Sequence, residues 1–257
     1  IYSHIKNILK YKMDSYLNRN WYRTKFYSRL WCSQKSPPFH TLFVTVLCFY
    51  VQLSDSHVSL RTPPKIEDPW WHYMASGVSH FGNTHFFSNI MSVIAFGTLL
   101  EIIHGNFAAF TIFWYSCISG ATWHAALYGS FSCYRGASPG VYGLIGAYLA
   151  HIIINWKEAP LRFIWLILFI FEALNIVFLY NSNERYRNQV AHWSHSFGFI
   201  QGTLLSLIVL RNMVVHNWEI LIQVLAFFVS LTIITVNTII IYNNYNDPEY
   251  MFVGTCE

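Results

Sequence analysis

The chain has 257 residues, of which 54% are hydrophobic and 11% are charged. Because soluble domains carry about 25% charged residues, this composition excludes an ordinary water-soluble domain and indicates a membrane protein. The formal net charge of +4 is uneven, since eight of the 16 Lys and Arg residues precede residue 38 and Asp14 is the one acid among them.

The chain divides by composition into a basic arm, a long apolar region and a short tail. A basic arm can bind nucleic acid, but beside a membrane span we interpret residues 1–37 as a cytosolic flank with no nucleic-acid partner. The sequence begins with Ile1, and Met13 is a candidate start, which would make residues 1–12 a leader or part of a longer chain. No cleavable signal peptide is expected, because the first apolar run begins too far into the sequence. Residues 38–245 form the expected membrane domain, followed by a tail at 246–257.

Seven apolar segments, each near the ~20 residues that cross the hydrocarbon of a bilayer, are expected to be transmembrane helices. A long loop with the aromatic cluster Trp70-Trp71-His72-Tyr73 separates the first two. The sequence therefore predicts an all-α membrane protein with no soluble domain. In chain order the segments are 39–53, 85–103, 107–127, 139–156, 161–180, 190–210 and 220–242.

The basic N-terminal arm sets the expected orientation. With the arm in the cytosol, the second, fourth and sixth spans all begin at the outer surface and the acidic tail lies in a lumen or outside the cell. We expect a multi-pass protein of the Golgi and secretory pathway or of the plasma membrane.

Four polar residues lie near the starts of these three spans and therefore at similar depth: His85, Asn89, Ser138 and His195. Polar side chains within spans are costly and point to function. Because His85 and Asn89 are four residues apart, they share one helix face. The alternatives without catalysis are a serine that hydrogen-bonds to its own backbone, an interfacial histidine and an asparagine that joins helices.

Small residues indicate how these spans approach one another. Gly143 and Ala147 form one stripe, and Ser194, Gly198 and Gly202 form another. Small stripes let helices pack closely, which would bring Ser138 within hydrogen-bond reach of His195.

The chemistry that this set permits is nucleophilic catalysis. A histidine can take the proton of a serine near neutral pH, and the resulting oxyanion needs hydrogen-bond donors. The candidate donors are the backbone N–H of Ser138 at a helix start and the side chains of His85 and Asn89. No acid is placed to orient His195, so the prediction is a dyad.

The five cysteines show no metal-ligand spacing. Cys48 and Cys117 are expected to be packing residues. A disulfide between Cys133 and Cys256 is an alternative that the sequence leaves open.

Several segments resemble the rhomboid intramembrane serine proteases, over about residues 65–245. His80, His85 and Asn89 fit the His-x4-His-x3-Asn pattern of that family. The other matching segments are GASPGVYGL at 136–144, GTLLE at 97–101 with His104-Gly105, and AHWSHSFG at 191–198 continuing to Gly202. Asn155-Trp156 and Leu210-Arg211-Asn212 resemble the animal secretase-type rhomboids.

The resemblance implies a six-helix catalytic core plus a seventh C-terminal helix. It implies that Ser138 is the nucleophile, that His195 is the general base packed against Tyr142, and that His85, Asn89 and Ser138 form the oxyanion hole. It implies no metal and no cofactor. It also implies single-pass transmembrane substrates, cleaved near the lumenal or extracellular face with release of ectodomains or ligands.

Three positions depart from the pattern of that family. Pro139 stands where Gly often follows the nucleophile; proline lacks an N–H but suits the first turn of a helix, so activity is expected to survive. His72 stands where a Trp-Arg pair is usual, which puts a structural arginine contact in doubt. Phe197 replaces a smaller residue and either crowds the helix interface or narrows the substrate path.

Two other functions compete with an active protease. One is a catalytically inactive relative that binds transmembrane clients and directs their traffic. The unusual residues Pro139 and His72 favour this alternative. The other is a small transporter or receptor, which is weaker because no paired half-helices or repeated halves are visible.

Overall fold

The computed structural model describes residues 37–54, 71–128, 134–156, 191–212 and 217–245, with short helical pieces between residues 162 and 170. The regular elements within these ranges are helices. In chain order they are α2 (Phe39–Leu53), α3 (Trp71–Ala75), η2 (Ser76–Val78), α4 (Gly82–Ser92), the π-helical η3 (Val93–Gly97), α5 (Thr98–His104), α6 (Asn106–Tyr128), α7 (Ser138–Ile154), α10 (His192–Val209) and α11 (Asn217–Tyr245).

The short helices α3 and η2 lie in the stretch that was predicted as a long loop, whereas the longer described helices follow the predicted apolar segments with shifts at their ends. α2 coincides with the first segment, whereas α4, η3 and α5 form one continuous span that starts at Gly82, three residues earlier than expected. α7 stops at Ile154, two residues early, because Asn155 leaves the helical region with φ −115° and ψ 28°. The fifth predicted segment lies mostly outside the described residues, and so do the N-terminal arm, Cys133 and the tail with Cys256.

Two of the described spans have the length and composition to cross a bilayer. The spans Gly82–His104 and Trp218–Asn244 are long and apolar enough to cross a membrane, and Phe39–Leu53 and Ser138–Ile154 are shorter apolar helices. α11 exposes many large apolar side chains, as a helix in contact with lipid would. Phe227 and Phe228, for example, are more than half exposed.

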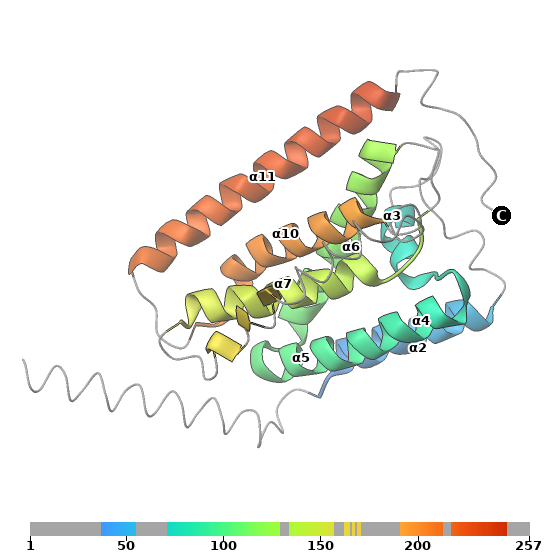
Figure 1. Cartoon of the computed structure of the whole chain (residues 1–257), viewed down its shortest axis with the longest axis horizontal. Helices are drawn as coiled ribbons and strands as arrows, with labels where there is room; N and C mark the ends of the chain where they lie inside the picture. The colour runs from blue at the N-terminus through green and yellow to red at the C-terminus, as the bar shows by residue number, and fades with distance from the viewer. Residues whose placement is uncertain are drawn as a thin grey trace, which may run out of the picture.

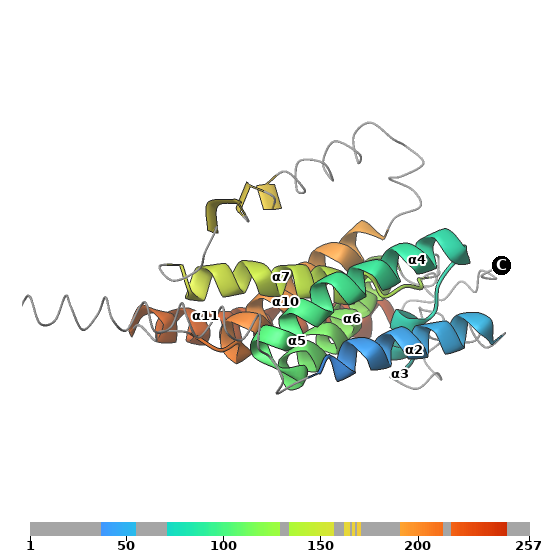
Figure 2. The ribbon, with the colours of Figure 1, turned by 90° about the horizontal axis from the view of Figure 1, so that it is seen from below.

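Three helices form the centre of the molecule (Figure 1). α10 packs chiefly against α7 and α6, which also pack against each other. α11 lies along one side of this centre, and α2, α4 and α5 lie along the other, as the two perpendicular views agree (Figure 2). The centre therefore holds the helices that carry Ser138 and His195.

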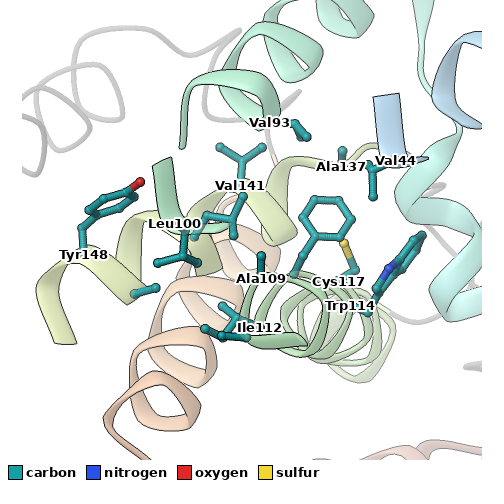
Figure 3. Close-up of a cluster of buried hydrophobic side chains, with 14 of the residues drawn as sticks. Val44, Val93, Leu100, Ala109, Ile112, Trp114, Cys117, Ala137, Val141 and Tyr148 are labelled. Carbon is teal, nitrogen blue, oxygen red and sulfur yellow. The ribbon is translucent and has the colours of Figure 1, made fainter. Parts of the chain in front are cut away.

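The buried apolar core joins the central helices to α2, α4 and α5 (Figure 3). Val44 of α2, Leu100 of α5, Ile112 of α6 and Leu144 of α7 are all fully buried in it. Cys117 of α6 is likewise buried and not in a disulfide. Its packing role was predicted from the apolar run in which it lies.

A buried carboxylate ties α5 to the start of α2. Glu101 accepts hydrogen bonds from the backbone N–H groups of His40 at 2.8 Å and Thr41 at 2.9 Å, and also from the Thr41 hydroxyl. The first N–H groups of a helix have no partner within the helix, and Pro38 before α2 makes no side-chain cap. Glu101 satisfies these donors and places its negative charge at the positive end of the helix dipole.

Candidate active site

Ser138 is the first residue of α7. The preceding residue, Ala137, has φ −72° and ψ −3°, and Pro139 occupies the first turn. The missing N–H of Pro139 costs nothing there, because that donor would have no partner within the helix. Its ring fits against two glycines of neighbouring helices: an added Cβ would lie 2.5 Å from the Pro139 Cβ at Gly120 and 2.8 Å from it at Gly198.

The backbone just before Ser138 is held by the segment that follows α3. The Gly136 N–H donates to the Ser76 carbonyl at 3.0 Å, and the Ala137 N–H donates to His80 Nε2 at 3.3 Å. The Tyr134 hydroxyl donates to the Gly136 carbonyl at 2.9 Å. Burial lowers the pKa of His80 to about 3, so its ring is neutral at physiological pH and can accept this bond. These three hydrogen bonds thus hold the backbone that leads to Ser138 in place.

Ser138 and His195 meet across the interface of α7 and α10. The Ser138 Oγ lies 2.8 Å from the His195 Nε2, although the two residues are 57 positions apart in the chain. The Tyr142 ring, one turn after Ser138, stacks on the His195 ring with centroids 4.6 Å apart and an interplanar angle of 16°. With the Nδ1 tautomer protonated, Nε2 can accept the serine proton, which is the geometry that a serine–histidine dyad requires.

Glycines set the close approach of the two helices. A Cβ on Gly198 would lie 2.6 Å from the Pro139 carbonyl oxygen. A Cβ on Gly202 would lie 2.4 Å from the Gly143 Cα and 2.7 Å from the Ser116 Oγ of α6. Since side-chain carbons do not approach backbone this closely, any larger residue at these positions would separate α10 from α7.

The two predicted oxyanion donors differ in their surroundings. The His85 ring and the nucleophile both approach Gly136: a Cβ on Gly136 would be 3.2 Å from His85 Nε2 and 3.6 Å from Ser138 Oγ, so these two atoms are at most about 7 Å apart. The Asn89 side chain is buried, and its amide donates to the His85 carbonyl at 3.0 Å within α4. In this structure Asn89 therefore braces the helix turn that carries His85.

Two histidines that the sequence analysis did not single out also surround His195. His124 of α6, His192 of α10 and His85 of α4 are near enough to His195 for a charge on any of them to act on its ring. The signal for His192 was its spacing, because residues three apart on a helix are neighbours. His124 carries no such sequence signal, since it comes from a different helix.

The structure also places the two unusual aromatic positions. Phe197 stacks on Trp123 of α6 with ring centroids 3.8 Å apart and an interplanar angle of 3°. It therefore packs into the contact between α10 and α6. His72 lies against its neighbour Trp71 at 4.1 Å between ring centroids.

The described ranges contain no group of three or more His, Cys, Asp or Glu side chains placed to hold a metal ion. The polar groups gathered near Ser138 are a hydroxyl, imidazoles and backbone N–H donors. Such a set can attack a carbonyl carbon, transfer a proton and stabilise an oxyanion.

The chain is similar to known proteins of one family. A family model described as Rhomboid domain matches residues 67–212. Rhomboid-related protein 1 of Caenorhabditis elegans is 29% identical over 226 residues, which are 77% of this chain and 62% of that protein. Rhomboid-related protein 2 of Mus musculus is 25% identical over 95 residues, 37% of this chain and 31% of that protein. Rhomboid-related protein 3 of Homo sapiens is 27% identical over 105 residues, 41% of this chain and 26% of that protein. The matched part of the chain thus spans less than two thirds of the length of each of these relatives.

Proposed function

Because this chain belongs to the rhomboid family of membrane proteins, we propose that it is an intramembrane serine endopeptidase that cleaves transmembrane segments of single-pass proteins. The observation that carries the proposal is the 2.8 Å contact between Ser138 Oγ and His195 Nε2, with the imidazole held by the Tyr142 ring. A protein that only binds clients has no need of this geometry.

The proposed reaction has two halves. In the first, His195 Nε2 takes the proton of Ser138 as Oγ attacks the scissile carbonyl, and then gives it to the leaving amine to form an acyl-enzyme. In the second, His195 takes a proton from water, the hydroxide attacks the ester, and the proton returns to Ser138. The dyad lacks an acid among its described contacts, so the ring stack with Tyr142 supplies the orientation of the imidazole.

The negative charge that develops on the carbonyl oxygen needs preorganised donors. The backbone N–H of Ser138 has no partner within α7 because it belongs to the first turn. The positive end of the α7 dipole lies at the same place. We assign the third contribution to the His85 side chain and a supporting role to Asn89, whose amide would have to leave the His85 carbonyl to reach an oxyanion.

The expected orientation puts this site near the lumenal or extracellular face. Ser138 is the first residue of α7, and His85 and His195 are each the fourth residue of their helices α4 and α10. All three helices begin at the same side of the bilayer if the basic arm is cytosolic. Water can then reach the site from outside, and cleavage would release ectodomains or ligands into that space.

The decisive experiment compares the parent chain with Ser138→Ala and His195→Ala on a single-pass reporter with a soluble ectodomain. Ser196→Ala is the matched control, because this exposed serine neighbours His195 on α10. We expect release by the parent and the control, and only background release by the two dyad variants. Equal release by the parent and Ser138→Ala would reject the proposal, and equal absence of release with retained client binding would favour an inactive client-binding protein.

A further inference from the structure

The seventh helix of the predicted topology, α11, presents a polar stripe to the rest of the molecule. Glu219, Ala226, Ser230 and Asn237 are buried, and Asn244 donates to a carbonyl of α6. At 100° per residue these five positions fall within about 40° of one another around the helix. α11 packs against α10 and α6, and its buried residues form this stripe, while its apolar face is exposed.

Hydrogen bonds tie this stripe to the core at three levels. The Asn212 amide donates to the Glu219 carboxylate near the start of α11, and the Asn244 amide donates to the Ala126 carbonyl at 2.8 Å near its end. Ser230 makes the middle contact. With a rise of about 1.5 Å per residue, the three levels are roughly 16 and 21 Å apart, which covers the ~30 Å hydrocarbon thickness.

The middle contact joins α6, α10 and α11 in one closed network. The Ser230 hydroxyl donates to Gln201 Oε1 at 2.7 Å, and Gln201 Nε2 donates back to the Ser230 carbonyl at 3.3 Å. The Tyr115 hydroxyl of α6 lies 2.7 Å from the Ser230 Oγ and completes the network. Gln201 is fully buried, and its amide group meets α11 at Ser230 through these two hydrogen bonds. An amide buried without partners is unfavourable, so this network holds α11 against α10.

Gln201 belongs to the same helix as the histidine of the dyad. It follows His195 by six residues and projects about 120° away from it around α10. On the α7 side of α10, Gly198 touches the backbone of Pro139 so closely that no Cβ fits. α10 is therefore clamped between α7, which carries Ser138, and α11.

We propose that α11 is a positioning element of the active site, which acts through Ser230 and Gln201 to press α10 against α7 and so sets the contact between Ser138 and His195. Loss of the network lets α10 move away from α7, and the proton-transfer distance grows. This inference rests on the proposed protease function, and it assigns to the seventh helix a role in the rate of the chemical step.

The test uses purified variants of the whole chain in detergent. For each variant, kcat and KM are measured with a single-pass reporter, and thermal unfolding is measured in the same detergent. The rate at which a fluorophosphonate probe labels Ser138 is measured as well. Ser230→Ala and Gln201→Leu each break the middle network. Thr235→Val is the matched control, because this lipid-facing hydroxyl bonds only the Leu231 carbonyl of its own helix in the described structure. Asn244→Ala removes a tie between α11 and α6 without touching α10.

We expect Ser230→Ala and Gln201→Leu to lower kcat and probe labelling about tenfold at unchanged KM, since a displacement of about 1 Å can cost up to 100-fold. Asn244→Ala should lower the unfolding temperature and keep kcat within about twofold of the parent. If all three variants lose thermal stability equally and keep the parent kcat, the stripe is only structural and the inference fails. Should Gln201→Leu not fold, Ser230→Ala, which removes a single hydroxyl, decides the matter.

The outcome for the parent chain separates the two proposals. A parent that shows no Ser138-dependent labelling refutes the protease function itself. A parent that labels normally, with Ser230→Ala and Gln201→Leu labelled at the same rate, refutes only the positioning role of α11.

Discussion

Replacing Gly198 by alanine tests whether close helix packing sets the distance between Ser138 and His195. The added Cβ would lie 2.6 Å from the Pro139 carbonyl oxygen and 2.8 Å from the Pro139 Cα, whereas ordinary contact begins at 3.4 Å. Both atoms belong to backbone that cannot rotate away, so α10 must move from α7 by about 0.8 Å, the difference between 3.4 and 2.6 Å. Overpacking of this kind costs about 1–3 kcal/mol of stability.

The same displacement acts on the dyad. The contact between Ser138 Oγ and His195 Nε2 is 2.8 Å, and a shift of similar size takes the pair to about 3.6 Å, where no hydrogen bond exists. We therefore expect kcat for a single-pass reporter to fall by about 100-fold, in line with the cost of a 1 Å misplacement. KM should change little, because the substrate-binding surface keeps its residues.

The assay measures initial cleavage rates per folded enzyme, with folded fractions taken from thermal unfolding in the same detergent. Ser196→Thr is the control, since it adds one methyl group to an exposed position of the same helix. A Gly198→Ala enzyme that folds and retains the parent kcat would show that the contact with Pro139 does not set the dyad distance.

Three further predictions concern single side chains around the core and the site. Glu101→Gln should lower the free energy of unfolding by about 3 kcal/mol, because one of the accepting oxygens at the start of α2 becomes an amide donor; chemical unfolding in mixed micelles measures this. His80→Phe should cost about 1–3 kcal/mol at pH 7.5 by leaving the Ala137 N–H without an acceptor. Burial lowers the pKa of His80 to about 3, so the stability that neutral His80 supplies is complete above pH 6.5 and declines as the pH falls toward 3, by up to about 1.4 kcal/mol per unit. The difference between parent and variant should accordingly shrink between pH 7.5 and 5.5, and a constant difference would contradict the assigned neutral acceptor. Tyr142→Phe should keep kcat within about threefold because the ring stack on His195 survives, whereas Tyr142→Ala should lower it about tenfold; equal kcat values for the two variants would show that the stack does not orient the imidazole.

Local composition by itself indicated a helical membrane protein and located the longer helices that the structure describes. The apolar run at Phe39–Leu53 became α2 without change, because hydropathy and helix propensity are properties of neighbouring residues. The same kind of information put Ser138 and His195 near the starts of their helices. The family motifs then identified the relatives that the family comparison confirmed. The helix ends were less accurate, since Gly82 and Asn155 set them through backbone angles that composition does not encode.

Only the tertiary structure decided which helix faces meet. The pairing of Ser138 with His195, of Ala137 with His80 and of Gln201 with Ser230 joins residues 57, 57 and 29 positions apart. The 100° period of a helix says which residues share a face, but it does not say which face of another helix lies opposite. That choice depends on glycine contacts and buried hydrogen bonds that form only when the helices pack together.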